Sequence, residues 1–262
     1  MNKNMHHFST ITELPLKEIS ETQLKRSYQR YFFAREHCNG GRVIEIGCGG
    51  GQGLNLIKDR ADEIIGYDID SKNVGVCIET YKNDDKIIIK CENAETIKFK
   101  PSSIQTVILF ETIYYLNNHQ KFFQNLFNAL KSGGKIIICT ANNNWHSFNP
   151  SPFSTKYFDA KELHELGIDN SFDVETYASF RDIPRNLLDR LKNSIKRIAI
   201  RFDIIPKTMN TKLLFKKIFS GKMVIMPEKF EKNTIEYIPP EKTDPYRVDI
   251  YSTAIFAIFT KR

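Results

Sequence analysis

The sequence predicts a doubly wound α/β fold on the basis of three observations. Strand-like and helix-like segments alternate through the first half of the chain, which favours parallel strands joined by crossover helices. Two strand-like segments, KIIIKC at 86–91 and KIIICT at 135–140, are continuous apolar runs, as in parallel sheets covered on both faces. A glycine-rich turn, GCGGGQG at 47–53, directly follows the first apolar strand.

Composition and charge limit the class of partner. The chain has 262 residues, of which 41% are hydrophobic and 26% are charged, and this balance is typical of a soluble domain. A net charge of +7 favours an anionic partner, unless the excess charge only solvates the surface. Because the chain has no long Lys/Arg block and no recognisable nucleic-acid module, we expect a small anionic acceptor and no nucleic acid.

The cysteines and the apolar runs indicate in which cellular compartment the protein is expected. None of the five cysteines forms a C-x-x-C pair, so we expect reduced thiols and no metal site. The first residues lack the apolar region of a signal peptide. No apolar run approaches the roughly 20 residues of a membrane-spanning helix. We therefore expect a cytoplasmic protein without a transmembrane segment.

The elements are expected in a regular order after a frayed start up to about residue 20. A helix over 21–37 carries aromatic residues that either pack on the core edge or cap a nucleotide pocket. Strands are expected at 42–46, 63–67, 86–91, 104–110, 135–140, 172–180 and 249–260, and further helices at about 51–60, 71–82, 118–131 and 159–167.

Residues 181–247 do not follow the alternating pattern. They contain an amphipathic, basic helix at 185–202 and a second apolar-basic stretch at 211–219. The expected organisation is therefore a helical cap at 1–37, a core at 38–180, a basic helical insertion at 181–247 and a completing strand at 248–262.

The glycine turn predicts a nucleotide cradle, because glycine lets a ligand approach the backbone and the following helix offers free N–H groups. A dinucleotide fingerprint fails, since its third glycine would fall on Gln52 or Leu54. A P-loop fails because no Gly-Lys-Ser/Thr follows the glycines. The pattern that remains is E-x-G-x-G-x-G, at Glu45, Gly47, Gly49 and Gly51.

This pattern resembles motif I of the class I S-adenosylmethionine-dependent methyltransferases. The segments 104–116 and 130–135 resemble the family's fourth strand, with Gln105 replacing its usual Asp, and its glycine turn before strand five. Asn93 stands where the family usually has an Asp that meets the adenine amino group. The resemblance implies a Rossmann-like, seven-stranded, mostly parallel sheet with an antiparallel last strand and a helical insertion before it.

The resemblance also implies S-adenosyl-L-methionine as cofactor and S-adenosyl-L-homocysteine as product. Glu45 would receive the methionine ammonium, and Asp68, which ends the second strand, would accept from the ribose hydroxyls. The residues assigned to cofactor binding are Tyr31, Glu45, Gly47, Cys48, Gly49, Gly51, Asp68, Ile69, Asn93, Ala94, Phe110 and Glu111.

Methyl transfer is an in-line displacement that needs alignment of the reactants, and a base helps when the acceptor is a hydroxyl. Tyr115 stands where many relatives have a histidine, and His146 lies in a lid-like loop, so these two are the predicted catalytic residues. His119 either replaces the missing histidine or faces solvent at a helix start. The residues expected to contact the acceptor are Tyr114, His119, Trp145, Ser151, Ser154 and Tyr157.

The run from the glycine pair at 133 to residue 158 is similar to methyltransferases found among bacterial surface-polysaccharide genes. That similarity implies O-methylation of a capsule or lipopolysaccharide precursor, such as a nucleotide-linked sugar or a phosphoramidate-type group. One alternative is a lipid or quinone acceptor, with helix 185–202 in peripheral contact with a membrane surface. A second alternative is a nucleic-acid or protein methyltransferase, or a cofactor-binding regulator without catalysis. The sequence sets neither O- versus N-methylation nor the oligomeric state.

Overall fold

The structure, a computed structural model, describes residues 13–183 and 222–262. The predicted helix at 185–202 and the stretch at 211–219 lie outside the described residues. Within the described ranges, no helix has the length and apolar character needed to cross a membrane.

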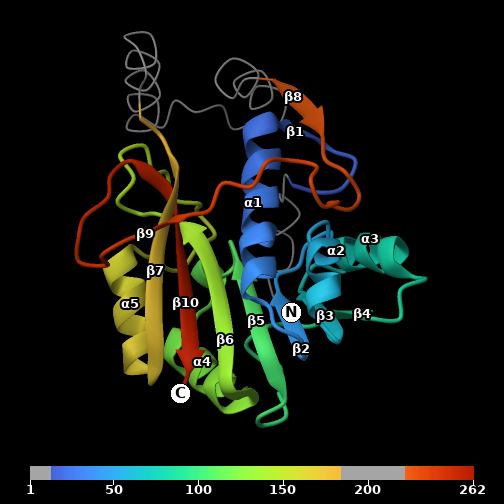
Figure 1. The fold of residues 1–262 in the computed structure, drawn as a ribbon, viewed down its shortest axis with the longest axis horizontal. Helices are drawn as coiled ribbons and strands as arrows, with labels where there is room; N and C mark the ends of the chain where they lie inside the picture. Colours follow the sequence, from blue (N-terminus) through green and yellow to red (C-terminus); the bar gives the residue numbers. More distant parts are fainter. Residues whose placement is uncertain (1–12, 184–221) are drawn as a thin grey trace.

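A mixed sheet forms the centre of the molecule, with the strand order β4-β3-β2-β5-β6-β10-β7-β9 (Figure 1). β2 to β6 are parallel, and β10 is inserted antiparallel between β6 and β7. Its strands are β2 (Arg42–Ile46), β3 (Glu63–Asp68), β4 (Ile87–Cys91), β5 (Ile104–Phe110), β6 (Leu130–Ala141), β7 (Phe172–Arg181), β9 (Glu241–Lys242) and β10 (Ser252–Lys261). The predicted doubly wound sheet with an antiparallel last strand is confirmed, and the two-residue β9 adds an eighth strand at one edge.

Helices cover both faces of this sheet (Figure 1). α1, α2 and α3 pack on one face, and α4 and α5 pack on the other. The helical elements are α1 (Glu21–His37), α2 (Leu54–Ile57), η2 (Lys58–Arg60), α3 (Ser71–Tyr81), η3 (Ile113–Tyr115), α4 (His119–Ala129) and α5 (Ala160–Asp169). The helix predicted at 51–60 is shorter than expected because Gly51 has a φ of +74°, outside the helical region, and residues 58–60 tighten into a 3₁₀ turn.

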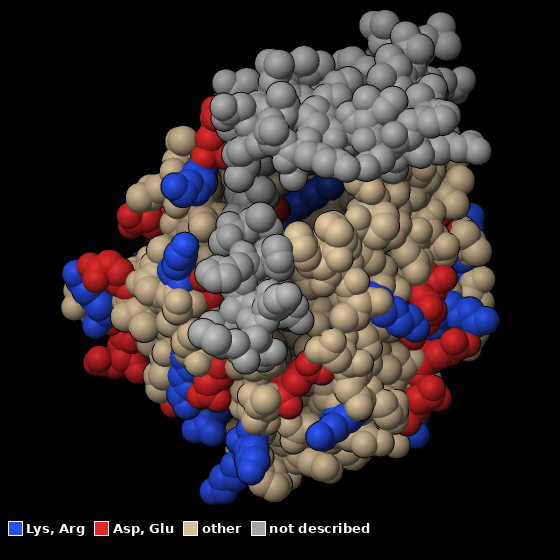
Figure 2. All heavy atoms as spheres, turned by 180° about the vertical axis from the view of Figure 1, so that it is seen from behind, with Lys and Arg blue, Asp and Glu red and all other residues tan. Residues whose placement is uncertain are grey.

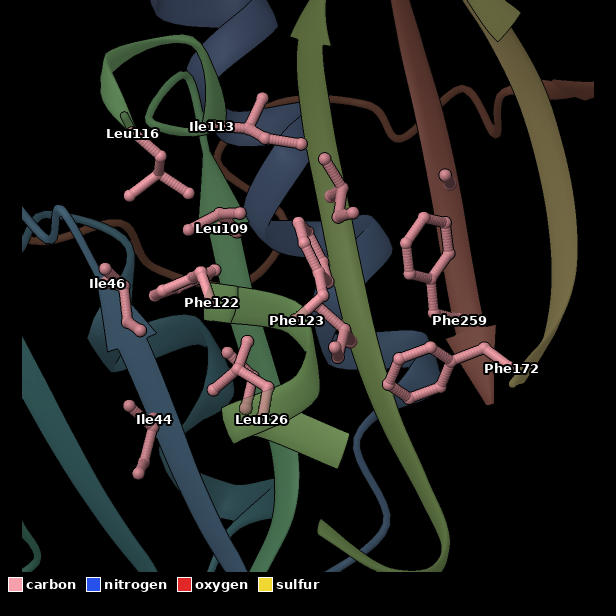
Figure 3. Close-up of a cluster of buried hydrophobic side chains, with 14 of the residues drawn as sticks. Ile44, Ile46, Leu109, Ile113, Leu116, Phe122, Phe123, Leu126, Phe172 and Phe259 are labelled. Carbon is pink, nitrogen blue, oxygen red and sulfur yellow. The ribbon is translucent and has the colours of Figure 1, made fainter. Parts of the chain in front are cut away.

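Aromatic residues of α4 fill the core between that helix and the sheet (Figure 3). Phe122, Phe123 and Leu126 recur at helical spacing and point at the strands. Phe123 lies beside Phe259 of β10, whereas Phe122 and Leu126 lie toward β2 and β5. Phe123 is fully buried and its ring centroid lies 5.5 Å from that of Phe259. The apolar residues of the helix predicted at about 118–131 therefore face the sheet.

The start of α1 is more ordered than the sequence suggested. β1 (Glu18–Ser20) pairs antiparallel with β8 (Met223–Ile225), so the expectation of a frayed start is wrong for these residues. Ser20 then caps the helix: its hydroxyl accepts from the Gln23 N–H, and the Gln23 side chain accepts from the Ser20 N–H, each at 3.2 Å. Pairing with a distant segment and a capping box together hold the helix that faces the cavity described below.

Candidate active site

A cavity of about 1290 Å³ opens at the carboxyl ends of the parallel strands. The strand order reverses between β2 and β5, and ligands of open α/β sheets bind at such switch points. The glycine loop after β2, Asp68 at the end of β3 and the residues that follow β4 and β5 line this cavity. α1, the loop after β6 and residues of β7 and β10 line it as well.

Different structural constraints require glycine at different positions of the loop. Gly47 has a φ of +78°, and a Cβ there would lie 2.1 Å from the Thr112 hydroxyl. Gly49 has a φ of +55° and no heavy atom within 4 Å of a Cβ position, so its backbone faces open space in the cavity. A Cβ on Gly51 would lie 2.2 Å from Cys77 Sγ in α3. The loop therefore combines close packing at two glycines with an open backbone face at Gly49.

Asp68 is fastened beside this open face. Its two carboxylate oxygens accept from the backbone N–H groups of Gly49 and Asp70, each at 2.8 Å. Burial raises the pKa of Asp68, while these hydrogen bonds oppose the rise. Each carboxylate oxygen has a second lone pair, so the side chain can still accept from a diol in the cavity.

Glu45 lies fully buried at the end of β2, behind the cavity wall. The Tyr31 hydroxyl donates to Glu45 Oε1 at 2.7 Å, and Tyr31 itself lines the cavity. Glu45 Oε2 has no hydrogen-bond partner among the described residues. Burial raises the pKa of Glu45 to about 8. A buried acceptor without a partner is costly, so this oxygen fits a ligand that brings a donor.

Most predicted site residues meet at this cavity. Those that line it are Tyr31, Gly47, Cys48, Gly49, Asp68, Ile69, Asn93, Ala94, Phe110, Glu111, Tyr114, Tyr115, Trp145 and Tyr157. Those that do not line it are Glu45, Gly51, His119, His146, Ser151 and Ser154. Most residues predicted to bind the cofactor thus line one cavity, although Glu45 and Gly51 do not, and the histidines and serines predicted near the acceptor do not line it either.

Neither histidine lines the cavity, and both have structural contacts. His119 Nε2 is 2.9 Å from the Ile113 carbonyl oxygen, and its ring packs edge-on against Phe158. His146 Nδ1 is 2.7 Å from the Ser147 hydroxyl, and its Nε2 is 3.3 Å from the Asp182 carbonyl oxygen. These contacts hold η3 to α4 and the loop after β6 to the end of β7.

The two serines shape the loop that brings Tyr157 to the cavity. The Ser154 hydroxyl donates to the Ser151 carbonyl at 2.6 Å, and the Ser151 N–H donates to the Tyr157 hydroxyl at 3.1 Å. Thr155 ties the loop to η3, since its N–H donates to the Tyr114 carbonyl at 2.7 Å. The Tyr114 and Tyr157 rings then lie 4.6 Å apart between centroids.

Sequence reasoning missed two arginines of α1 that line the cavity. Arg30 forms ion pairs with Glu13 at 2.8 Å and with Glu111 at 3.2 Å. Arg26 lies one helical turn earlier and also lines the cavity. Their spacing of four residues indicates a shared helix face. Nothing in the sequence shows that this face meets the ends of β5 and β7.

Comparison with known proteins agrees with the geometry of the glycine loop. A family model described as "Methyltransferase domain" matches residues 44–138. These residues are therefore similar to a methyltransferase domain. The match and the observed strand order agree with the resemblance predicted from the sequence and with S-adenosylmethionine as the cofactor.

Curated relatives share this domain over part of their length. A probable S-adenosylmethionine-dependent methyltransferase of Mycolicibacterium smegmatis is 32% identical over 154 residues, covering 56% of this chain and 57% of that protein. A mitochondrial ubiquinone biosynthesis O-methyltransferase of Rattus norvegicus is 26% identical, covering 40% and 32%. An 18S rRNA (guanine-N(7))-methyltransferase of Schizosaccharomyces pombe is 24% identical, covering 37% and 40%. The names of the last two relatives point to different acceptors.

Solved structures share the fold. The YcgJ protein of Bacillus subtilis superposes with a TM-score of 0.57 at 13% identity, covering 89% of this chain and 98% of that one. At this identity the likeness is one of architecture. None of the relatives described above points to surface-polysaccharide synthesis.

Proposed function

We propose that the chain is an S-adenosylmethionine-dependent methyltransferase that acts on an anionic small molecule. The observation that carries the proposal is that one cavity is lined by two chemically different sets of residues, which we call its first and second halves. The first half contains the open backbone of Gly49 beside Asp68, with the partnerless Glu45 oxygen behind it. The second half contains aromatic side chains and two arginines.

The residues of the first half fit the cofactor. Asp68 would accept from the ribose hydroxyls, Glu45 would receive the ammonium directly or through water, and Gly49 would let the cofactor lie against the backbone. When bound, S-adenosylmethionine supplies an activated methyl group on a sulfonium. The protein's own contribution is alignment of the acceptor and exclusion of water by the aromatic wall of Tyr114 and Tyr157.

The acceptor proposed from the sequence is an anionic precursor such as a nucleotide-linked sugar or a phosphoramidate-type group. Arginine guanidinium groups suit such anions, and two of them line the second half. The surface-polysaccharide assignment stays a prediction from sequence resemblance.

A quinone-type or other ring acceptor is the second candidate. It is favoured by the aromatic wall, which offers ring faces for stacking, and by the acceptor in the name of the rat relative. A nucleic-acid acceptor has less support from the surface. Figure 2 shows Lys and Arg interspersed with Asp and Glu over the described part of one face, without one extended basic region.

The test is methyl transfer from labelled S-adenosylmethionine to fractionated small-molecule extracts, with mass spectrometry of the product. We expect label in an anionic, low-molecular-weight fraction, and none with Asp68→Ala. Binding of S-adenosylhomocysteine is measured in parallel. A wild-type protein that binds neither cofactor form would contradict the proposal, and label in RNA or protein would redirect it to the second alternative from the sequence.

A further inference from the structure

We propose that Arg26 is the residue that selects an anionic acceptor, namely a ring compound that carries a carboxylate or a phosphate monoester. This inference rests on the proposed function and assigns the acceptor's charged group to one side chain. It follows from three properties of the second half of the cavity: the unequal pairing of its two arginines, the surface that orients Arg26, and the aromatic wall beside them.

The two arginines of α1 are not equivalent. Arg30 is buried and bound to Glu13 and Glu111, so its charge is already balanced. Burial alone would lower the pKa of Arg30, but these two carboxylates raise it overall. Arg26 has no ion pair or hydrogen bond with any described side chain. Burial and the neighbouring Arg30 lower its pKa, and the more distant carboxylates of Asp182, Glu111 and Glu13 only partly oppose this. A half-buried guanidinium that has no direct carboxylate partner among the described side chains gains more from an incoming anion than one that is already paired.

Phe180 orients this guanidinium. Its ring lies 5.5 Å from Arg26 Cζ and also lines the cavity. Phe180 has a φ of +58°, which is unusual for a bulky residue, and Glu111, the partner of Arg30, has a φ of +49°. Each of these two residues contacts one arginine of the cavity: Phe180 contacts Arg26, and Glu111 contacts Arg30. Unfavourable backbone geometry concentrates at binding sites, where the surrounding structure enforces it.

The wall beside the arginines suits a ring. The Tyr114 ring is tilted against Tyr157, and the Phe148 ring meets Tyr157 edge-on at 4.7 Å. All three residues line the cavity. A flat apolar body can pack on this wall while its carboxylate or phosphate reaches the fork of Arg26. A neutral ring compound would gain only the packing.

Phenyl phosphate and phenol are the probes for this inference, because they share a ring and differ in charge. Their affinities are measured by calorimetry on the full chain saturated with S-adenosylhomocysteine. We expect phenyl phosphate to bind at least about tenfold tighter than phenol. Arg26→Gln should lose about tenfold or more of the phenyl phosphate affinity and leave phenol binding unchanged. The matched control is Lys25→Gln, which removes one positive charge from the adjacent, exposed position of the same helix and should retain wild-type affinity.

The affinity for S-adenosylhomocysteine shows whether each variant folds and whether the cofactor site exists. Equal phenyl phosphate affinity in wild type and Arg26→Gln would overturn the inference, and so would a wild-type protein without preference for phenyl phosphate. If S-adenosylhomocysteine binding is intact, either result would leave the proposed methyltransferase function in place. Loss of cofactor binding in the wild type would overturn the proposed function on which the inference rests.

Discussion

Glu45 shows how burial of one residue links folding to cofactor binding. Its carboxyl group is held by Tyr31 on one oxygen and has no described partner on the other. Burial raises its pKa from an ordinary 4.5 to about 8, although the Tyr31 hydrogen bond opposes the rise. The folded protein without cofactor therefore favours the protonated acid, whereas an ammonium ligand needs the carboxylate.

This conflict predicts an opposite pH dependence for stability and for affinity. Because the folded pKa is raised, the contribution of Glu45 to stability is complete below about pH 4.5 and is lost as the pH rises through about 8. The affinity for S-adenosylhomocysteine should rise over the upper part of that interval. Calorimetry across pH measures the affinity, and thermal unfolding without ligand measures the stability. In Glu45→Gln both dependences should flatten; an unchanged slope would assign them to another group.

Tyr115 and His146 were the predicted catalytic pair, and the structure separates them. Tyr115 lines the cavity, whereas His146 does not line it and contacts the cavity-lining Ser147 and the Asp182 carbonyl. We propose that Tyr115→Phe lowers turnover about tenfold or more with little change in cofactor affinity, because a residue beside the acceptor acts on its alignment. We expect His146→Ala to lower thermal stability more than turnover. Steady-state kinetics and unfolding of both variants measure this, and a large turnover loss in His146→Ala alone would restore the histidine as the catalytic residue.

At the scale of elements, the contact between α1 and the glycine loop places Tyr31. A Cβ on Gly53 would lie 2.0 Å from the Tyr31 ring. That ring cannot move away easily, because its centroid lies 5.3 Å from that of Phe110 and 6.1 Å from that of Phe230. The absence of a side chain at Gly53 thus lets α1 pack closely against the glycine loop.

Substitution of two glycines by alanine tests this docking. Gly53→Ala should destabilise the protein by about 1–3 kcal/mol through overpacking and should weaken S-adenosylhomocysteine binding. The control is Gly75→Ala on the exposed face of α3, where a Cβ meets no heavy atom within 4 Å. It should stabilise by about 0.5–1 kcal/mol, because alanine loses less backbone entropy in a helix. Urea unfolding measures both free energies. Equal stability of Gly53→Ala and wild type would show that α1 can shift at no cost.

At the scale of the whole molecule, the cavity draws on both ends of the described chain. α1 comes from the start, the glycine loop and Glu111 from the middle, and Ala254 from the last strand. A ligand that fills such a cavity stabilises the folded state as a whole, because every lining segment must stay in place for it to bind.

Cofactor binding should therefore raise the unfolding temperature of the entire domain. At S-adenosylhomocysteine concentrations about 100 times the dissociation constant, the stabilisation is about 2.7 kcal/mol. For a chain of this size that corresponds to roughly 5–10 °C. Differential scanning fluorimetry measures the shift, and Asp68→Ala at the same concentration serves as the control without binding. Absence of a shift in the wild type, with ligand shown to be bound, would mean that the unfolding unit lies outside the cavity.

The sequence alone predicted the order of the main strands and helices and proposed the residues of the cofactor half of the site. These predictions rest on local patterns: strand periodicity, the terminating glycines and the spacing of Glu45, Gly47, Gly49 and Asp68. Such patterns involve residues that are close in the sequence, so they can be recognised without the tertiary structure. For the acceptor half the sequence proposed Tyr114, Trp145 and Tyr157, whereas the arginines and Phe180 came only from the tertiary structure. Arg26, Phe180 and Tyr157 are distant in sequence, and only sheet pairing and the loop tied to η3 bring them to one cavity. The prediction that His119 and His146 face the acceptor was uncertain for the same reason, since the contacts of a side chain depend on which segments fold against it.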